Sequence, residues 1–245
     1  MAHTFVNKSQ HNAQTGNPIS INHTPGSAAT VVIVGIIGVG TAQRQGGAPT
    51  IDGTTATQAD ITRGGAASYE TSCEVWYVCK AFNGAQISIS IPNTTSMTCH
   101  VEVVSAYAGS GYGSAYHSSD GDGQTSGNGL ALTFSQNAQG DFKYARLGCG
   151  EQNIGSITPT WTDAVEVYQY DPGAYTMWSH YLICGASNAD PSWVWSSDDG
   201  AVVGVCFKSV AMPTNYPRNM DGHLILGTAQ LSRRLTSKRK TEGSV

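Results

Sequence analysis

The stretch Thr30–Val39 reads TVVIVGIIGV and is the longest apolar run in the chain. Length alone would also allow a helix. However, the run is rich in β-branched residues and is interrupted by Gly35 and Gly38, which favours a strand. A continuous apolar run of this kind is typical of a strand that is buried on both faces. The sequence therefore predicts a central strand at this position.

Further short segments bounded by turn residues also predict strands. Ile87, Ile89 and Ile91 alternate with serines, so one face of that strand should meet a core and the other water. Cys99, Val101 and Val103 alternate in the same way with His100 and Glu102. The predicted strands besides Thr30–Val39 are Pro18–Asn22, Cys73–Cys79, Gln86–Ile91, Cys99–Ser105, Leu130–Ser135, Phe142–Leu147, Val165–Tyr170, Met177–Cys184 and Ala201–Val210.

The composition agrees with an all-β fold. Only 12% of the 245 residues are charged and 29 are glycine, which argues against a charged helical bundle. We therefore expect one domain built as a two-layer, mainly antiparallel β-sandwich. The residues expected to face its core are Val32, Val34, Ile87, Ile89, Val101, Val103, Val203, Val205 and Phe207.

The chain divides into three expected parts. Residues 1–16 form an N-terminal extension, residues 17–210 the β-sandwich domain, and residues 211–245 a basic C-terminal arm. Within the domain, the polar and glycine-rich run Ala108–Gly129 is expected to be a long exposed loop, because such a composition does not pack by itself. No run of 18 apolar residues occurs, so no membrane-spanning helix is expected. The polar N-terminus lacks a signal-peptide core.

The arm is expected to be an assembly element. Its basic residues suit an acidic partner or a neighbouring copy, and its apolar residues would anchor it. A solvated tail that aids solubility remains an alternative, and a nucleic-acid contact is a weaker one. The residues that carry this prediction are Leu224, Ile225, Leu226, Leu231, Arg233, Arg234, Leu235, Lys238, Arg239 and Lys240.

The six cysteines form no C-x-x-C pair and no zinc-finger spacing, so no metal site is expected. Most are expected to be buried thiols, with disulfides between strands or subunits as the alternative in an extracellular particle. Cys79, Cys99, Cys184 and Cys206 are the candidates for such bridges.

No catalytic group is recognisable. Cys99 and His100 are neighbours in a predicted strand and should point to opposite faces, so they do not form a dyad. Asp120 and Asp122 begin a calcium-like motif that lacks the later glycine and glutamate, so they are expected to be turn residues, with a weak Ca²⁺ site as the alternative. Gly38 and Gly40 lack the third glycine of a dinucleotide loop. We therefore expect no enzyme activity and no cofactor.

Aromatic residues gather between residues 161 and 195. Such a cluster suits a sandwich core with its rim, a protein interface or a surface on which sugars stack. The candidates for a sugar or protein contact are Trp161, Tyr175, Trp193 and Trp195.

The order of these segments resembles a known family. The strand at Val31–Val39, the segments PTIDG at 49–53 and EVWYV at 74–78, the strand Gln86–Ile91 and the closing AVVGVCFK at 201–208 are similar to the jelly-roll β-sandwich modules of tailed-bacteriophage virion proteins. The resemblance implies a decoration, fibre or neck/tail-associated protein, made in the host cytoplasm and located in the virion. Its partners would be other virion proteins and copies of itself. A carbohydrate-binding module that uses exposed aromatic residues is the alternative, and a hydrolase with dispersed carboxylates is a third.

Overall fold

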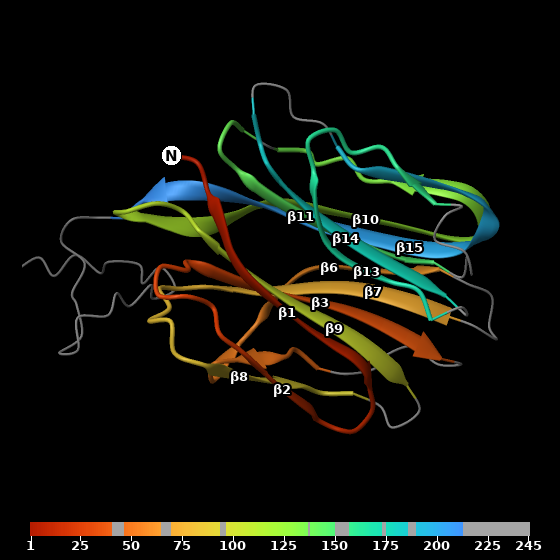
Figure 1. The fold of residues 1–245 in the computed structure, drawn as a ribbon, viewed down its shortest axis with the longest axis horizontal. Coiled ribbons are helices and arrows are strands. Elements are labelled where there is room, and N and C mark those ends of the chain that lie inside the picture. The colour runs from red at the N-terminus through yellow and green to blue at the C-terminus, as the bar shows by residue number, and fades with distance from the viewer. Residues whose placement is uncertain are drawn as a thin grey trace, which may run out of the picture.

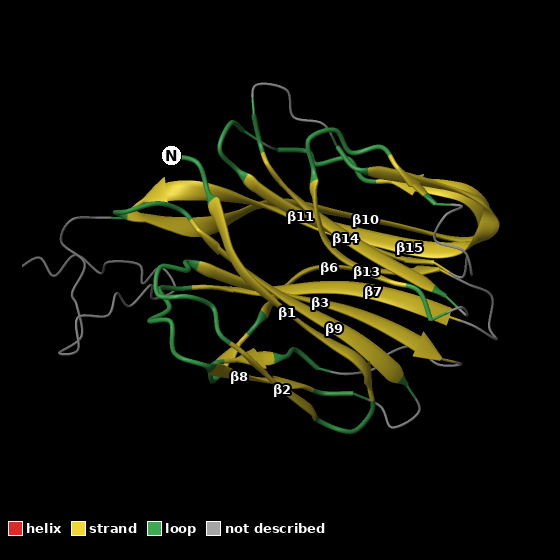
Figure 2. Cartoon of the chain, in the orientation of Figure 1, coloured by secondary structure: helices red, strands yellow, loops and turns green. Residues whose placement is uncertain are grey.

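The computed structural model describes residues 1–40, 47–64, 70–93, 97–136, 138–149, 157–172, 175–185 and 190–212. The described residues form strands, turns and loops and contain no helix (Figure 2). The strands are β1 (Thr4–Gln14), β2 (Ile19–His23), β3 (Val31–Gly40), β4 (Thr50–Ile51), β5 (Thr54–Thr55), β6 (Thr57–Gly64), β7 (Glu70–Cys79), β8 (Ile87–Ile91), β9 (Thr98–Tyr107), β10 (Tyr112–Ala131), β11 (Phe142–Cys149), β12 (Thr158–Pro159), β13 (Val165–Tyr170), β14 (Thr176–Ile183) and β15 (Ser192–Ala211).

These strands form three antiparallel sheets. The central sheet has the order β1-β9-β3-β7-β6, the large sheet β10-β15-β11-β14-β13 with β12 paired to β15, and the small sheet β2-β8-β4-β5. The small sheet covers one face of the central sheet and the large sheet covers the other (Figure 1). The expected antiparallel β-sandwich is therefore confirmed, and the small sheet adds a third layer to the two that were predicted.

Strand β3 shows why the longest apolar run has no polar face. Val32, Val34 and Ile36 pack against the small sheet, whereas Val31 and Ile33 pack against the large sheet. All five side chains are fully buried. The prediction of a strand buried on both faces is confirmed.

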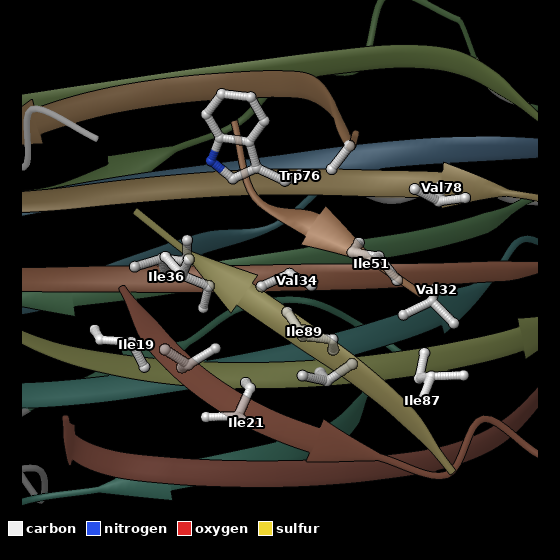
Figure 3. Close-up of a cluster of buried hydrophobic side chains, with 14 of the residues drawn as sticks. Ile19, Ile21, Val32, Val34, Ile36, Ile51, Trp76, Val78, Ile87 and Ile89 are labelled. Carbon is white, nitrogen blue, oxygen red and sulfur yellow. The ribbon is translucent and has the colours of Figure 1, made fainter. Parts of the chain in front are cut away.

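The nine residues predicted to face the core are all buried, but they belong to two different cores. Residues on β3, β8 and β9 fill the space between the small and central sheets, where Figure 3 shows Ile87 and Ile89 close to Val32 and Val34. Residues on β15 fill the space between the central and large sheets. The second group consists of Val203, Val205 and Phe207.

The N-terminal residues are not an extension outside the sandwich. β1 pairs with β9 along its length and forms an edge of the central sheet. Its polar sequence, TFVNKSQHNAQ, is compatible with an edge strand because most of its side chains stay partly exposed. The prediction that residues 1–16 form an extension outside the β-sandwich is therefore wrong.

The glycine-rich run Ala108–Gly129 is not a loop, and this prediction is also wrong. Most of it belongs to β10, which pairs with β15 as far as Tyr112 and Ala211. Gly123 faces β6 so closely that a Cβ there would lie 2.0 Å from the carbonyl oxygen of Arg63. Gly64 approaches Gly200 in the same way. The glycines allow the central and large sheets to meet backbone against backbone at this point. The aspartates of the calcium-like motif lie on this strand, where Asp120 accepts a hydrogen bond from the amide of Thr133 (2.6 Å).

Gly35 in β3 supports a first prediction. A Cβ at this position would lie 2.5 Å from the hydroxyl of Tyr144 and 3.0 Å from Nη1 of Arg146, both of which come from the large sheet. We expect Gly35→Ala to lower the free energy of unfolding by about 1–3 kcal/mol, because buried side chains must move to make room. Urea unfolding measures the change. Gly47→Ala is the control, since nothing lies within 4 Å of a Cβ there, and an equal loss in both variants would contradict the packing argument.

Candidate functional site

Two groups of buried polar side chains lie on opposite faces of the large sheet. The inter-sheet cluster, between the large and central sheets, consists of His100, Glu102, Tyr144, Arg146 and Ser179. The outer-face cluster, on the other face of the large sheet, consists of His117, Asp141, Cys184 and Cys206. Of these nine side chains, eight are buried and His117 is half-buried.

Arg146 is the centre of the inter-sheet cluster. It projects from β11 and is only 1% exposed. Its guanidinium donates hydrogen bonds to the carbonyl oxygens of Gly35 (2.5 Å) and His100 (3.2 Å), which lie on two strands of the central sheet. The charge is thus anchored in the opposite sheet.

Glu102 is the acidic member of the cluster. It is fully buried on β9, and its Oε2 accepts a hydrogen bond from the hydroxyl of Ser179 (2.6 Å). Burial raises the pKa of Glu102, while the charge of Arg146 and the bond from Ser179 oppose that shift. The predicted water-facing side of β9 is therefore wrong: His100 and Glu102 are both 0% exposed, because a second sheet packs over them. Cys99 does lie on the other face, so the prediction that it forms no dyad with His100 is confirmed.

Three buried histidines fix the first residues of the chain. The amide of Ala13 donates to Nδ1 of His100 (3.3 Å), and Nε2 of the same ring is hydrogen bonded to the hydroxyl of Tyr175 (2.8 Å). His23 lies between the hydroxyls of Ser9 (3.0 Å) and Ser105 (3.4 Å). His3 donates from Nδ1 to the carbonyl oxygen of Gly140 (3.0 Å).

Burial keeps these histidines neutral. It lowers the pKa of His23 and that of His100 to about 4, with a further contribution from His11 and Arg146 respectively, and it also lowers the pKa of His3. The three rings act as hydrogen-bonding ties between β1 and the rest of the fold. Protonation would leave a buried positive charge at each of them.

The inter-sheet cluster is closed to solvent at its charged groups. Arg146 and Glu102 have almost no exposed surface, so a substrate cannot contact either charge without separating the sheets. The cluster is arranged to join two sheets, and we expect its loss to be measured as lost stability.

The electrostatic interaction between Arg146 and Glu102 supports a second prediction. Arg146→Met removes the buried cation near Glu102 and leaves the carbonyl oxygens of Gly35 and His100 without their donor, and we expect the free energy of unfolding to fall by about 3–5 kcal/mol. The double variant with Glu102→Gln also removes the carboxyl group and should recover part of that loss. Urea unfolding of the single and double variants gives the coupling energy. Losses that simply add would contradict an interaction between the two residues.

Acid sensitivity is the third prediction. The histidine pKa values are lower in the folded state than the ordinary value of about 6.5, so their stabilising contribution is present above pH 6.5 and is lost as the pH falls toward 4. We expect a loss on the order of 2 kcal/mol for each of His23 and His100 across this range. His100→Asn should flatten the pH dependence measured by urea unfolding. A wild-type protein whose stability is constant from pH 6.5 to 4.5 would contradict it.

The outer-face cluster has different chemistry. Nδ1 of His117 lies 2.6 Å from Oδ2 of Asp141, and Sγ of Cys206 lies 3.7 Å from the same oxygen. The thiols of Cys184 and Cys206 are hydrogen bonded to one another. The amide of Ala138 donates to Oδ2 of Asp141 (2.8 Å). An imidazole, a carboxylate and thiols at this separation are groups that can bind a soft or borderline metal ion.

The structure brings together two of the four cysteines predicted for disulfides. Cys184 and Cys206 are neighbours, whereas Cys79 and Cys99 pair with Val31 and Gly38 of β3, about 23 Å apart along that strand. None of the six cysteines is bridged in this structure, and five of them are buried. Oxidation of Cys184 and Cys206 stays a prediction.

The predicted aromatic contact residues are mostly in a core. Trp161, Trp193 and Trp195 are between 1% and 7% exposed and pack with Leu147 and Leu182 on the outer face of the large sheet. The hydroxyl of Tyr175 bonds to His100. A surface on which sugars stack cannot be formed by these three tryptophans. The predicted arm residues, from Leu224 to Lys240, lie outside the described residues.

Comparison with known proteins finds no family model, no curated protein and no solved structure that matches the chain. Within the described residues, no helix has the length and apolar character needed to cross a membrane.

Proposed function

We propose that the chain is a structural subunit of a tailed-bacteriophage virion, a decoration, fibre or neck/tail-associated protein that acts through contacts with copies of itself and with other virion proteins. The resemblance to jelly-roll virion modules supports this proposal. So does the confirmed all-β antiparallel sandwich, in which the buried charges join the sheets to one another.

The observation that carries the proposal is the distribution of charge along the chain. Residues 1–210 hold seven basic and fifteen acidic side chains, a net charge of −8, whereas residues 211–245 hold six basic and two acidic ones, a net charge of +4. Opposite charges on two parts of one chain favour attraction between neighbouring copies. We call residues 1–210 the acidic block and residues 211–245 the basic segment. The acidic block of one copy is a suitable partner for the basic segment of the next.

The place where the basic segment leaves the block fits this role. The amide of Met212 bonds to the carbonyl oxygen of Gly111 (2.9 Å), and Gly109 packs against Met1, so the N-terminus and residue 212 lie at the same end (Figure 1). A pocket of about 280 Å³ opens there between Phe82, Tyr107 and Met212. This end combines a hollow lined by both apolar and polar residues with the start of the basic segment, which suits an assembly contact.

Charge reversal in the basic segment is the fourth prediction. The variant R233E/R234E/K238E/R239E/K240E should lose self-association, because the segment then repels the acidic block. Sedimentation velocity should show assemblies of the wild-type chain at about 50 mM salt that dissociate as the Debye length falls below about 8 Å. The control R233K/R234K/K238R/R239K/K240R keeps every charge and should behave as wild type.

Two results would count against the proposal. Assembly of the charge-reversed variant at the wild-type level would show that the basic segment is dispensable. Absence of the chain from purified virus particles of its source, tested by mass spectrometry, would overturn the virion assignment.

A further inference from the structure

The outer-face cluster draws its side chains from four separate stretches of the chain. Cys206 lies on β15, opposite Lys143 of β11. Asp141 immediately precedes β11, and Cys184 immediately follows β14. His117 comes from β10, where the register between Tyr116 and Ser118 shifts by one residue. A bulge of this kind turns a side chain out of the regular alternation and is common beside functional sites.

The backbone holds two of these residues next to each other. The amide of Cys184 donates to the carbonyl oxygen of Asp141 (2.8 Å), and the amide of Gly140 donates to the carbonyl oxygen of Cys184 (2.7 Å). These two bonds continue the pairing of β11 with β14 by one more step. The side chains of Asp141 and Cys184 therefore leave the sheet side by side.

The separations suit one tetrahedral metal ion. Nδ1 of His117, the carboxylate of Asp141 and Sγ of Cys206 all lie within 4.8 Å of one another. Ligand atoms around zinc are about 3.3–3.8 Å apart, given bond lengths of about 2.0–2.3 Å. The distance from Sγ of Cys206 to Oδ2 of Asp141 is already 3.7 Å. The distance of 2.6 Å between His117 and Asp141 would need to open by less than about 1 Å.

Burial and charge favour a bound cation. Cys206 is 0% exposed and Cys184 is 3% exposed, so thiolates here are shielded from water and from oxidants. The carboxylate of Asp141 lies beside both thiols, and the ammonium of Lys143 lies near them. That ammonium is itself paired with Asp190 (2.7 Å). The bond from Ala138 to Asp141 orients the carboxylate, as outer-shell bonds do in metal sites.

We propose that His117, Asp141 and Cys206, whose ligand atoms already lie together, bind one Zn²⁺ ion, and that the nearby thiol of Cys184 moves closer to become the fourth ligand. Two thiolates, one imidazole and one carboxylate form a four-ligand set of borderline softness, which selects zinc over calcium and magnesium. Four protein ligands leave no open position, so the ion has a structural role. It ties β10, β15 and the ends of β11 and β14 together on the outer face of the large sheet.

The test is metal content and affinity of the full chain, purified under reducing conditions. Elemental analysis after incubation with Zn²⁺ and removal of excess should find one zinc per chain. Cys206→Ser and His117→Gln should each weaken zinc binding by at least about 100-fold, because even loss of an outer-shell partner costs about 10–100-fold. Cys79→Ser removes a thiol from the central sheet and should leave the affinity unchanged.

Cobalt gives a readout that does not depend on the variants folding. Co²⁺ added to the wild-type chain should produce the intense visible bands of a tetrahedral site and a thiolate-to-metal charge-transfer band, and Zn²⁺ should remove both. Chelation should lower the melting temperature of the wild-type protein and leave that of His117→Gln unchanged.

Three outcomes would overturn the proposal. The first is that the reduced wild-type chain binds no zinc. The second is that His117→Gln and Cys206→Ser bind zinc as tightly as Cys79→Ser does. The third is a Cys184–Cys206 disulfide in protein purified without reductant, together with no zinc binding after reduction, which would assign the two thiols to a covalent bridge.

Discussion

The guanidinium of Arg146 has to find hydrogen-bond acceptors inside the protein, and the arrangement of the two larger sheets depends on this requirement. Apolar side chains would pack against one another in several alignments, because the hydrophobic effect has no direction. A buried guanidinium allows far fewer alignments of the two sheets, because each N–H group that is left without an acceptor costs free energy. Its acceptors are carbonyl groups of Gly35 and His100 on adjacent strands of the central sheet, and the carboxyl group of Glu102 interacts with it electrostatically. Gly35 admits the side chain because it has no Cβ. One arginine thus fixes both the spacing and the alignment of two sheets.

Strands with a strong apolar pattern could be predicted from the sequence, and strands with a polar pattern could not. The predicted strand Val165–Tyr170 has the bounds of β13 in the structure, and the predictions for β3, β8 and β9 agree within two residues at each end. β1, β6 and β10 were missed because they are edge strands of their sheets and carry few apolar residues. β10 is rich in glycine, and these glycines are explained only by the backbone of β6 that packs against them. That backbone lies about sixty residues away in the sequence. The number of layers was hidden for a related reason: Val34 and Val205 look alike in sequence but belong to separate cores.

The two polar clusters could also be predicted only in part from the sequence. Alternation on β9 correctly separated Cys99 from His100, but it could not show that the polar face would be covered by a second sheet. Glu102 therefore looked like a surface residue. The outer-face cluster had no detectable spacing, since its members are spread from residue 117 to residue 206 and one of them depends on a bulge. The cysteine candidates were the best available signal. Two of the four do meet, because Cys184 pairs with Asp141 on one side of β11 and Cys206 lies opposite Lys143 on the other side of the same strand.

Hydrogen bonds connect the outer-face cluster to one end of the acidic block. This is the end that holds the N-terminus and residue 212, where we propose that copies assemble. Gly140, next to the ligand Asp141, accepts hydrogen bonds from both the amide and the ring of His3. The same ring contacts Ser114, near the start of β10, and Ser114 bonds to Thr30 at the start of β3 (2.7 Å). The N-terminus and residue 212 lie at this end of β10. An ion that orders residues 138–141 would therefore also restrain His3 and the N-terminus beside the exit of the basic segment. Because each connection is a hydrogen bond between buried or half-buried groups, the restraint acts through the folded block and does not require contact between the ion and a partner.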